Sequence, residues 1–174
     1  PAVHKTREQI TDLFHEHHSP LGYTDRVTQR EALVNEARSV LRERFVSADV
    51  GITGAKFLVA ETGANVIVTN EGNGDLTSCL PRVHIVTAGI EKVVPSLDDL
   101  SVLLRVLARS ATGQEFSAYT SLYSGPRRAD DIEGPEAYHV VLLDNGRSRL
   151  LGGQYQPMLR CIRCGACLNH CPVY

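Results

Sequence analysis

Two stretches near the start of the chain carry apolar side chains at the spacing of amphipathic helices. Residues 6–18 place Ile10 and Phe14 on one side of a helix, and most other positions are polar or charged. Residues 24–46 give the clearest helical pattern, with one apolar stripe and one charged face, and Thr24 is placed to cap its start. The pattern therefore predicts two helices before the character of the chain changes.

The middle of the chain consists of short apolar runs. Residues 56–61 and 65–71 are rich in β-branched side chains and apolar on both faces, and the turn residues 62–64 between them predict a hairpin. Residues 82–89 predict a third strand. Because strands that are apolar on both faces need cover on both sides, we expect the hairpin to lie inside a layered domain.

The second half alternates between helix and strand. Residues 97–110 predict a helix whose broad leucine stripe indicates burial between two layers, and Ser96 and Asp99 predict a capping box at its start. Residues 115–124 and 137–144 predict two further strands. Strands that alternate with helices predict an α/β fold class.

The end of the last predicted strand is marked by a turn. Asn145 and Gly146 predict a tight turn, after which residues 147–151 are expected to return alongside the strand. The glycines that follow predict a hinge. We therefore expect an α/β domain over residues 1–153 and a separate segment over residues 154–174.

Composition and charge narrow the class of protein. Of 174 residues, 43% are apolar and 22% charged, which is typical of a globular domain. The net charge of −2 gives no field that would attract nucleic acid. No apolar run approaches the roughly 18 residues of a transmembrane segment, and no secretion leader is seen, so we expect a cytoplasmic protein. A chain that starts at Pro1 is expected to be a fragment of a longer protein.

The cysteines are concentrated at the end of the chain. Four of the five follow the spacing C-x2-C-x2-C-x3-C-P: Cys161, Cys164, Cys167 and Cys171. This is the spacing of bacterial ferredoxin runs, in which thiolates hold a 4Fe–4S cluster. Zinc sites more often use two cysteine pairs separated by a longer loop, which leaves zinc as the weaker alternative.

The ligand count of this cysteine run is incomplete. In two-cluster ferredoxins the fourth cysteine of a run serves the other cluster, so the first three would lack a ligand and Cys171 would belong to a second cluster. The remaining cysteine, Cys79, is expected to be a small apolar core residue. We expect the missing ligands to lie beyond Tyr174, so that this fragment holds an incomplete cluster, none, or adventitious zinc.

A glycine-rich segment, residues 70–75, follows a predicted strand. Thr77 stands where a dinucleotide-binding fingerprint has its third glycine, and no Walker-type lysine follows. Two interpretations stay open: a loop whose N–H groups cradle an anion, or a tight turn that needs a positive φ. Glu61 and Glu71 flank the hairpin and face either a ligand or solvent. No Ser-His-Asp set or carboxylate pair is present, so no catalytic residue is assigned.

Several stretches together resemble the lactate-utilisation protein B family, whose characteristic unit is the LUD domain. The most specific are AETGANVIVTNEGNG, residues 60–74, and LPRVHIV, residues 80–86. The resemblance extends through YTSLYSGPRR and VVLLDNGRSRLL to the cysteine run, over essentially the whole chain. It implies a three-layer α/β fold similar to that of the sugar-phosphate isomerase and CoA-transferase group.

The resemblance also implies a function. Family members are associated with oxidation of L-lactate to pyruvate in a cytosolic assembly with two sister subunits, and full-length members carry two 4Fe–4S clusters. By analogy the four clustered cysteines are cluster ligands. Residues in the family's characteristic loops, and a matching pair at the chain start that could face the same cleft, are candidates for binding a small organic acid: Glu61, Gly63, Asn70, Glu71 and Gly72, with His4 and Lys5. A domain without its first strands is expected to expose apolar sheet and to self-associate.

Three functional hypotheses follow. The favoured one is an iron–sulfur electron-transfer subunit, so that any enzymatic activity belongs to an L-lactate-oxidising complex. The second is a small-anion-binding α/β enzyme that acts directly on a hydroxy acid. The third is a zinc-stabilised binding module without redox chemistry.

Overall fold

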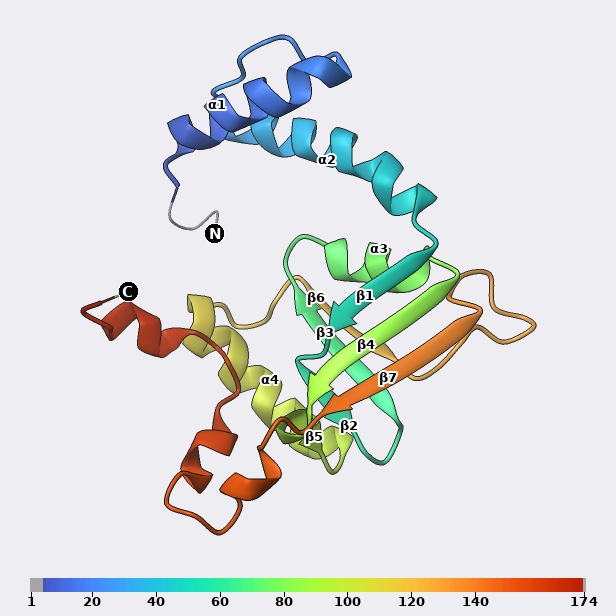
Figure 1. Cartoon of the computed structure of the whole chain (residues 1–174), viewed down its shortest axis with the longest axis vertical. Coiled ribbons are helices and arrows are strands. Elements are labelled where there is room, and N and C mark those ends of the chain that lie inside the picture. Colours follow the sequence, from blue (N-terminus) through green and yellow to red (C-terminus); the bar gives the residue numbers. More distant parts are fainter. Residues whose placement is uncertain (1–4, 174) are drawn as a thin grey trace. The chain divides into compact units, whose positions relative to one another are not determined.

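The computed structural model describes residues 5–173 and divides the chain into two units, one up to Ala48 and one from Asp49 onward (Figure 1). The first unit contains helix α1 (Arg7–His18), a short 3-10 turn (Ser19–Leu21) and helix α2 (Arg30–Ser47). Among the described residues, no helix combines the length and apolar character needed to span a bilayer.

Helix α1 begins one residue after the start predicted from the sequence, because Thr6 is its N-cap. Thr6 Oγ1 accepts a hydrogen bond from the backbone N–H of Gln9, and Gln9 Oε1 accepts one from the N–H of Thr6, at 3.3 and 2.9 Å. This reciprocal capping box satisfies two N–H groups that the helix itself leaves free. At the other end, His18 Nδ1 lies 2.7 Å from Glu36 Oε1 of α2, which joins the two helices.

The start predicted for α2 was wrong. The helix begins six residues after Thr24, and its N-cap is Gln29, whose side chain makes no capping bond. In the segment before the helix, the Arg26 guanidinium forms an ion pair with Asp12 of α1 at 2.7 Å.

The second unit contains two sheets. One is parallel, with strand order β1-β4-β7; its members are β1 (Val50–Gly54), β4 (Val83–Gly89) and β7 (Ala137–Leu143). The other is mixed, with order β5-β2-β3-β6; its members are β5 (Val93–Val94), β2 (Phe57–Val59), β3 (Ala64–Thr69) and β6 (Tyr119–Tyr123). The predicted hairpin is confirmed as β2–β3, with Phe57 opposite Val66. The other three predicted strands are confirmed as β4, β6 and β7.

Strand β1 was not predicted, because its sequence VGITG contains two glycines, which strands usually avoid. Gly51 has a structural reason. A Cβ at this position would collide with the backbone oxygen of Thr77 in helix α3 (Asn73–Cys79), which packs directly on β1. The close approach of a helix backbone to a strand therefore requires glycine here.

Helix α4 (Leu97–Thr112) covers one face of the mixed sheet. Ser96 caps it, since its Oγ accepts a hydrogen bond from the N–H of Asp99 at 3.2 Å. The main core cluster lies between α4 and this sheet: Phe57, Val59, Val66, Val94, Leu100 and Leu107. Burial of α4 between two layers, expected from its sequence, was wrong. Within the second unit its outer side is open, and Val102 is 61% exposed.

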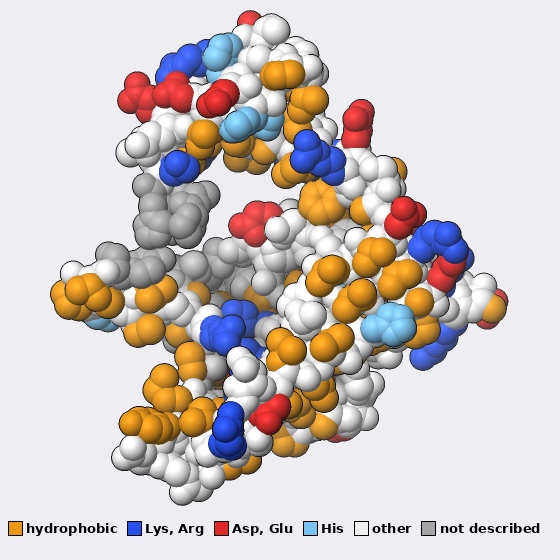
Figure 2. All heavy atoms as spheres, in the orientation of Figure 1, with side chains coloured by type: hydrophobic (Ala, Val, Ile, Leu, Met, Phe, Trp, Pro, Cys, Tyr) orange, Lys and Arg blue, Asp and Glu red, His pale blue; other side chains and the backbone are white. Residues whose placement is uncertain are grey.

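The opposite face of the mixed sheet packs on the parallel sheet. Leu58 contacts Val86 and Ala88 there. The layers are therefore helix α4, mixed sheet and parallel sheet, which confirms the α/β class predicted from the alternating pattern. Figure 2 shows apolar side chains gathered over the outer face of the parallel sheet, where Ile52 and Val141 are exposed.

The chain after β7 forms no returning strand, contrary to the prediction. Asn145 and Gly146 make the tight turn with φ angles of 41° and 82°. The carboxylate of Asp144 then accepts hydrogen bonds from the N–H and the hydroxyl of Ser148, both at 2.7 Å, and these bonds start a 3-10 helix (Ser148–Leu150) instead. Two more 3-10 helices follow, Gln156–Arg160 and Ala166–His170.

The cysteine segment belongs to the second unit. Ile162 and Cys164 pack against the core cluster between α4 and the mixed sheet. The predicted boundary between residues 153 and 154 thus falls within that unit. These contacts place the cysteine run beside the ends of several strands.

Candidate functional site

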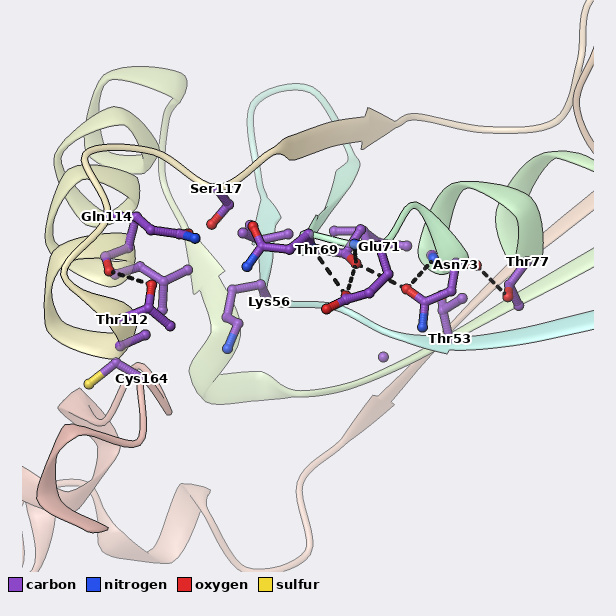
Figure 3. A pocket seen from close by; sticks show the side chains of 18 of the residues that line it. Thr53, Lys56, Thr69, Glu71, Asn73, Thr77, Thr112, Gln114, Ser117 and Cys164 are labelled. Atoms are coloured by element: carbon purple, nitrogen blue, oxygen red, sulfur yellow. Dashed lines mark hydrogen bonds between the residues drawn. The ribbon is translucent and has the colours of Figure 1, made fainter. Parts of the chain in front are cut away.

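An open cavity of about 550 Å³ lies where several elements of the second unit end. Strands β1 and β3 contribute their carboxyl ends, α3 its first turns and α4 its last turns. Figure 3 shows Lys56 between two groups of lining side chains: Thr53, Thr69, Glu71, Asn73 and Thr77 on one side and Thr112, Gln114, Ser117 and Cys164 on the other. Because ligand sites of α/β proteins gather at strand ends, we take this cavity as the candidate functional site.

The glycine-rich loop forms the edge of this cavity between β3 and α3. Asn70 and Glu71 line it, and Gly72 follows with a φ of 75°, which residues with a Cβ rarely adopt. Thr69 Oγ1 lies 2.9 Å from Glu71 Oε2 and 3.0 Å from Asn73 Oδ1, so its hydroxyl holds the turn together. The interpretation as a tight turn with positive φ is confirmed, and the cradling of an anion by this loop stays a prediction.

The other candidates from the family loops lie elsewhere. Glu61 Oε1 accepts a hydrogen bond from the N–H of Leu97 at 2.6 Å, so it caps α4, and Gly63 forms the hairpin turn with a φ of 68°. Both are at the opposite end of the β2–β3 hairpin from the cavity. Lys5 is exposed just before α1 in the first unit. His4 lies outside the described residues.

Lys56 and the cysteine segment meet at this cavity. Lys56 Nζ donates a hydrogen bond to the backbone oxygen of Arg163 at 3.2 Å. Burial lowers the pKa of Lys56, the positive charge of Arg163 acts in the same direction, and the neighbouring Cys164 opposes it. The site therefore combines a partly desolvated ammonium with a thiol from a segment more than a hundred residues away.

The cysteine run is only partly buried. Cys161 and Cys167 are exposed, whereas Cys164 and Cys171 are half-buried. Within residues 5–173, no three side chains of Cys, His, Asp or Glu are grouped so that they could hold a metal ion. The thiols supply the donor chemistry of an iron–sulfur cluster, but this conformation does not bring three of them together.

Cys79 is half-buried rather than fully in the core, and burial raises the pKa of its thiol. It lies at the end of α3, beside a polar network under the cavity. In that network Asp75 Oδ1 accepts a hydrogen bond from the Tyr123 hydroxyl at 2.5 Å. Burial and this bond raise the pKa of Tyr123 well above its usual range.

A buried histidine supports the cavity wall. His84 Nε2 lies 2.8 Å from Oγ1 of Thr53, which lines the cavity, and 3.4 Å from Ser78 Oγ of α3. The His84 side chain is fully buried, and burial lowers its pKa, so the imidazole is neutral at neutral pH. Its role is to hold β1, β4 and α3 together behind the cavity.

Comparison with known proteins decides the family. Residues 1–143 match the LUD domain. The chain belongs to the LUD domain family. Its sequence is similar over all 174 residues to lactate utilization protein B of Bacillus velezensis (51% identical), Anoxybacillus flavithermus (48%) and Bacillus subtilis (48%). The chain spans 36% of the length of each of these proteins.

A solved structure is also similar to this LUD domain. It is the crystal structure of a DUF162 family protein from Deinococcus radiodurans, 20% identical, with a TM-score of 0.44. The similarity covers 57% of this chain and 56% of that one. The family resemblance drawn from the sequence is thus confirmed by the domain match and by relatives that align along the whole chain.

Sequence reasoning found part of the cavity of this LUD domain. Asn70 and Glu71 were candidates and do line it, because the glycine-rich turn marks the end of a strand. Lys56 and Thr53 were missed. The available signal for Lys56 was its position at the start of an otherwise apolar strand in a chain with only three lysines. Thr53 carried no signal, because β1 itself was not predicted.

Proposed function

We propose that this chain is part of an iron–sulfur electron-transfer subunit that serves the oxidation of L-lactate to pyruvate. The observation that carries the proposal is the ferredoxin-type cysteine run within a chain about half identical, along its whole length, to proteins named lactate utilization protein B. The relatives' name supplies the metabolic role, and the cysteine spacing supplies the cofactor class.

The chemistry requires an electron carrier. Conversion of L-lactate to pyruvate releases two electrons and two protons, and an iron–sulfur cluster, when bound, accepts electrons one at a time. Cys161, Cys164 and Cys167 would ligate one cluster, and Cys171 a second. In this proposal two sister subunits supply the lactate-oxidising centre and the onward acceptor, in a cytoplasmic assembly.

The test is metal and sulfide analysis of the full-length protein, purified without oxygen. We expect iron, acid-labile sulfide and an EPR signal after reduction, and we expect Cys164→Ala to lose about half of the iron and sulfide, because it removes a ligand of one of the two clusters. Cys79→Ala is the matched control, since it removes a thiol from a different element and should keep the cluster. Zinc at full occupancy with no labile sulfide would instead support the zinc-stabilised module and end the redox proposal.

A second experiment separates the carrier from an enzyme that acts alone. Purified full-length protein is mixed with L-lactate and an artificial one-electron acceptor, with and without the sister subunits. We expect turnover only when the sister subunits are present. Turnover by the isolated protein would favour the alternative, a domain that acts directly on the hydroxy acid, for which the cavity next to Cys164 is the specific support.

A further inference from the structure

A smaller cavity of about 210 Å³ adjoins the candidate site and shares Lys56 with it. Its volume is far above the roughly 15 Å³ that a single water needs. Three cationic side chains line it: Lys56, Lys92 and Arg163. Two of the chain's three lysines therefore reach one small cavity, although they come from different elements and lie 36 positions apart in sequence.

Lys92 is the unusual member of this group. It follows β4 and is only 6% exposed, and within the described residues its Nζ has no hydrogen-bond partner. A buried ammonium without a partner is costly, because it loses hydration and gains nothing in return. Burial lowers the pKa of Lys92, and the nearby positive charges of Arg163 and Lys56 lower it further. An anion in the cavity would relieve both effects.

The neighbouring acidic residue offsets this positive charge only in part, because Glu91 raises the pKa of Lys92 by less than burial and the two cations lower it. Glu91 Oε2 lies 2.6 Å from Nε of Arg147, so the carboxylate is also paired with that arginine. Glu91 Oε1 is 3.8 Å from a guanidinium nitrogen of Arg163, a distant contact. Arg147 and Arg163 both lie near this one carboxylate, and Lys56 and Lys92 add two further positive charges, so positive charge is in excess beside the cavity.

The rest of the cavity wall is aliphatic and small. Ala55, Ile67 and Val68 line it, with the backbone of Gly54. A wall of this kind suits a short carbon chain, whereas a phosphate would place polar oxygens against it and leave them without donors. The combination favours an anion that has one charged end and one apolar end.

We propose that this cavity binds a small organic carboxylate, with its charged end among Lys56, Lys92 and Arg163 and its carbon chain against Ala55 and Ile67. The site extends the proposed function, because L-lactate is such a carboxylate. It rests on the cavity residues themselves and does not require a cluster. Lys56 would link it to the larger cavity and to the cysteine segment.

The test uses calorimetric titration of the full-length protein at constant ionic strength. The probes are L-lactate, glycolate and pyruvate, with neutral L-lactamide and inorganic phosphate as comparisons. At least one of the three carboxylates is expected to bind with one-to-one stoichiometry, and L-lactamide, which keeps the size of lactate but lacks its charge, is expected not to bind. Lys92→Met should weaken the carboxylate affinity at least tenfold.

Arg38→Gln is the charge-matched control, since Arg38 is an exposed cation of α2 in the other unit, and it should keep the wild-type affinity.

Melting temperatures show whether each variant folds. Lys92→Met should melt higher than wild type without ligand, because it removes an unpartnered buried charge, and carboxylate should no longer raise its melting point. If Lys92→Met does not fold, Lys56→Gln, at the less buried lysine, carries the same test.

Three results would overturn the site: equal binding of L-lactamide, tighter binding of phosphate than of any carboxylate, or unchanged affinity in the lysine variants. The failure of the redox proposal is distinguishable from these. Carboxylate binding by a protein without labile sulfide would sustain this site while the electron-transfer proposal fell.

Discussion

The two sheets of the second unit are similar in apolar content but differ in how they are covered. The mixed sheet has α4 on one face and the parallel sheet on the other, so Phe57 is 2% exposed. Within the second unit the parallel sheet is covered on one face only, and Ile52 on its outer face is 65% exposed. Apolar side chains along a strand therefore indicate a sheet face that another layer could cover, but they do not show that such a layer is present.

In β4, the central strand of the parallel sheet, the difference between the covered inner face and the open outer face can be followed residue by residue. Along β4 the side chains alternate between half-buried and buried, with His84, Val86 and Ala88 on the inner face. The outer face carries Val83 and Ile85, which are in register with exposed or half-buried neighbours on β1 and β7. Folding energy is thus expected to come from one face of this sheet and from both faces of the mixed sheet.

The strongest test of this contrast is Phe57→Ala in the mixed sheet. The substitution removes a fully buried ring from the core cluster under α4 and leaves a cavity. We expect the free energy of unfolding to fall by about 3–5 kcal/mol, measured by urea denaturation of the second unit. A loss below about 1 kcal/mol would mean that α4 does not cover this face in solution.

A smaller effect is expected where the two sheets are joined by a hydrogen bond. The hydroxyl of Tyr138 on β7 donates to Oδ1 of Asn65 on β3 at 2.8 Å, and Asn65 is fully buried. Tyr138→Phe would leave that amide oxygen unsatisfied, at a cost of about 1–3 kcal/mol. The ring is kept, so unchanged stability in the same denaturation assay would show that the sheets do not pack as described.

Acidic solution should weaken the inner face of the parallel sheet. Because burial lowers the pKa of His84 below its ordinary 6.5, the unfolded chain binds a proton that the folded chain resists. Stability is therefore full above about pH 6.5 and falls as the pH drops toward the lowered value. His84→Gln should reduce this slope in denaturation curves between roughly pH 7 and 5. His139→Gln is the control on the outer face; equal slopes in both variants would contradict the assignment.

The smallest effect is expected at the outer face itself. Ile52→Ser should change the free energy of unfolding by no more than about 0.5 kcal/mol, because its side chain is already in contact with solvent. Self-association, which the sequence led us to expect, is tested by sedimentation velocity on the same variant. A large loss of stability in Ile52→Ser would show that another layer covers this face in solution.

The candidate site also contains residues that the local sequence pattern predicts and residues that only long-range contacts bring together. The loop residues Asn70 and Glu71 were predictable, because a strand followed by a glycine-rich turn is a local pattern. The meeting of Lys56 and Lys92 was not, since it depends on β2 pairing in parallel with β5 and on the crossover from the other sheet. Glu61 was predicted from a family loop to be a candidate ligand-binding residue, but its carboxylate caps α4 instead.

The sequence by itself determined the elements whose causes lie within a few residues. The capping of α4 by Ser96, the β2–β3 hairpin and the turn at Gly72 all depend on neighbouring side chains or on backbone freedom. Only the tertiary structure decided where α2 begins, which sheet face is open and which charges share a cavity. The physical reason is that periodicity shows which side of an element is apolar, whereas burial and charge pairing depend on contacts with residues far along the chain.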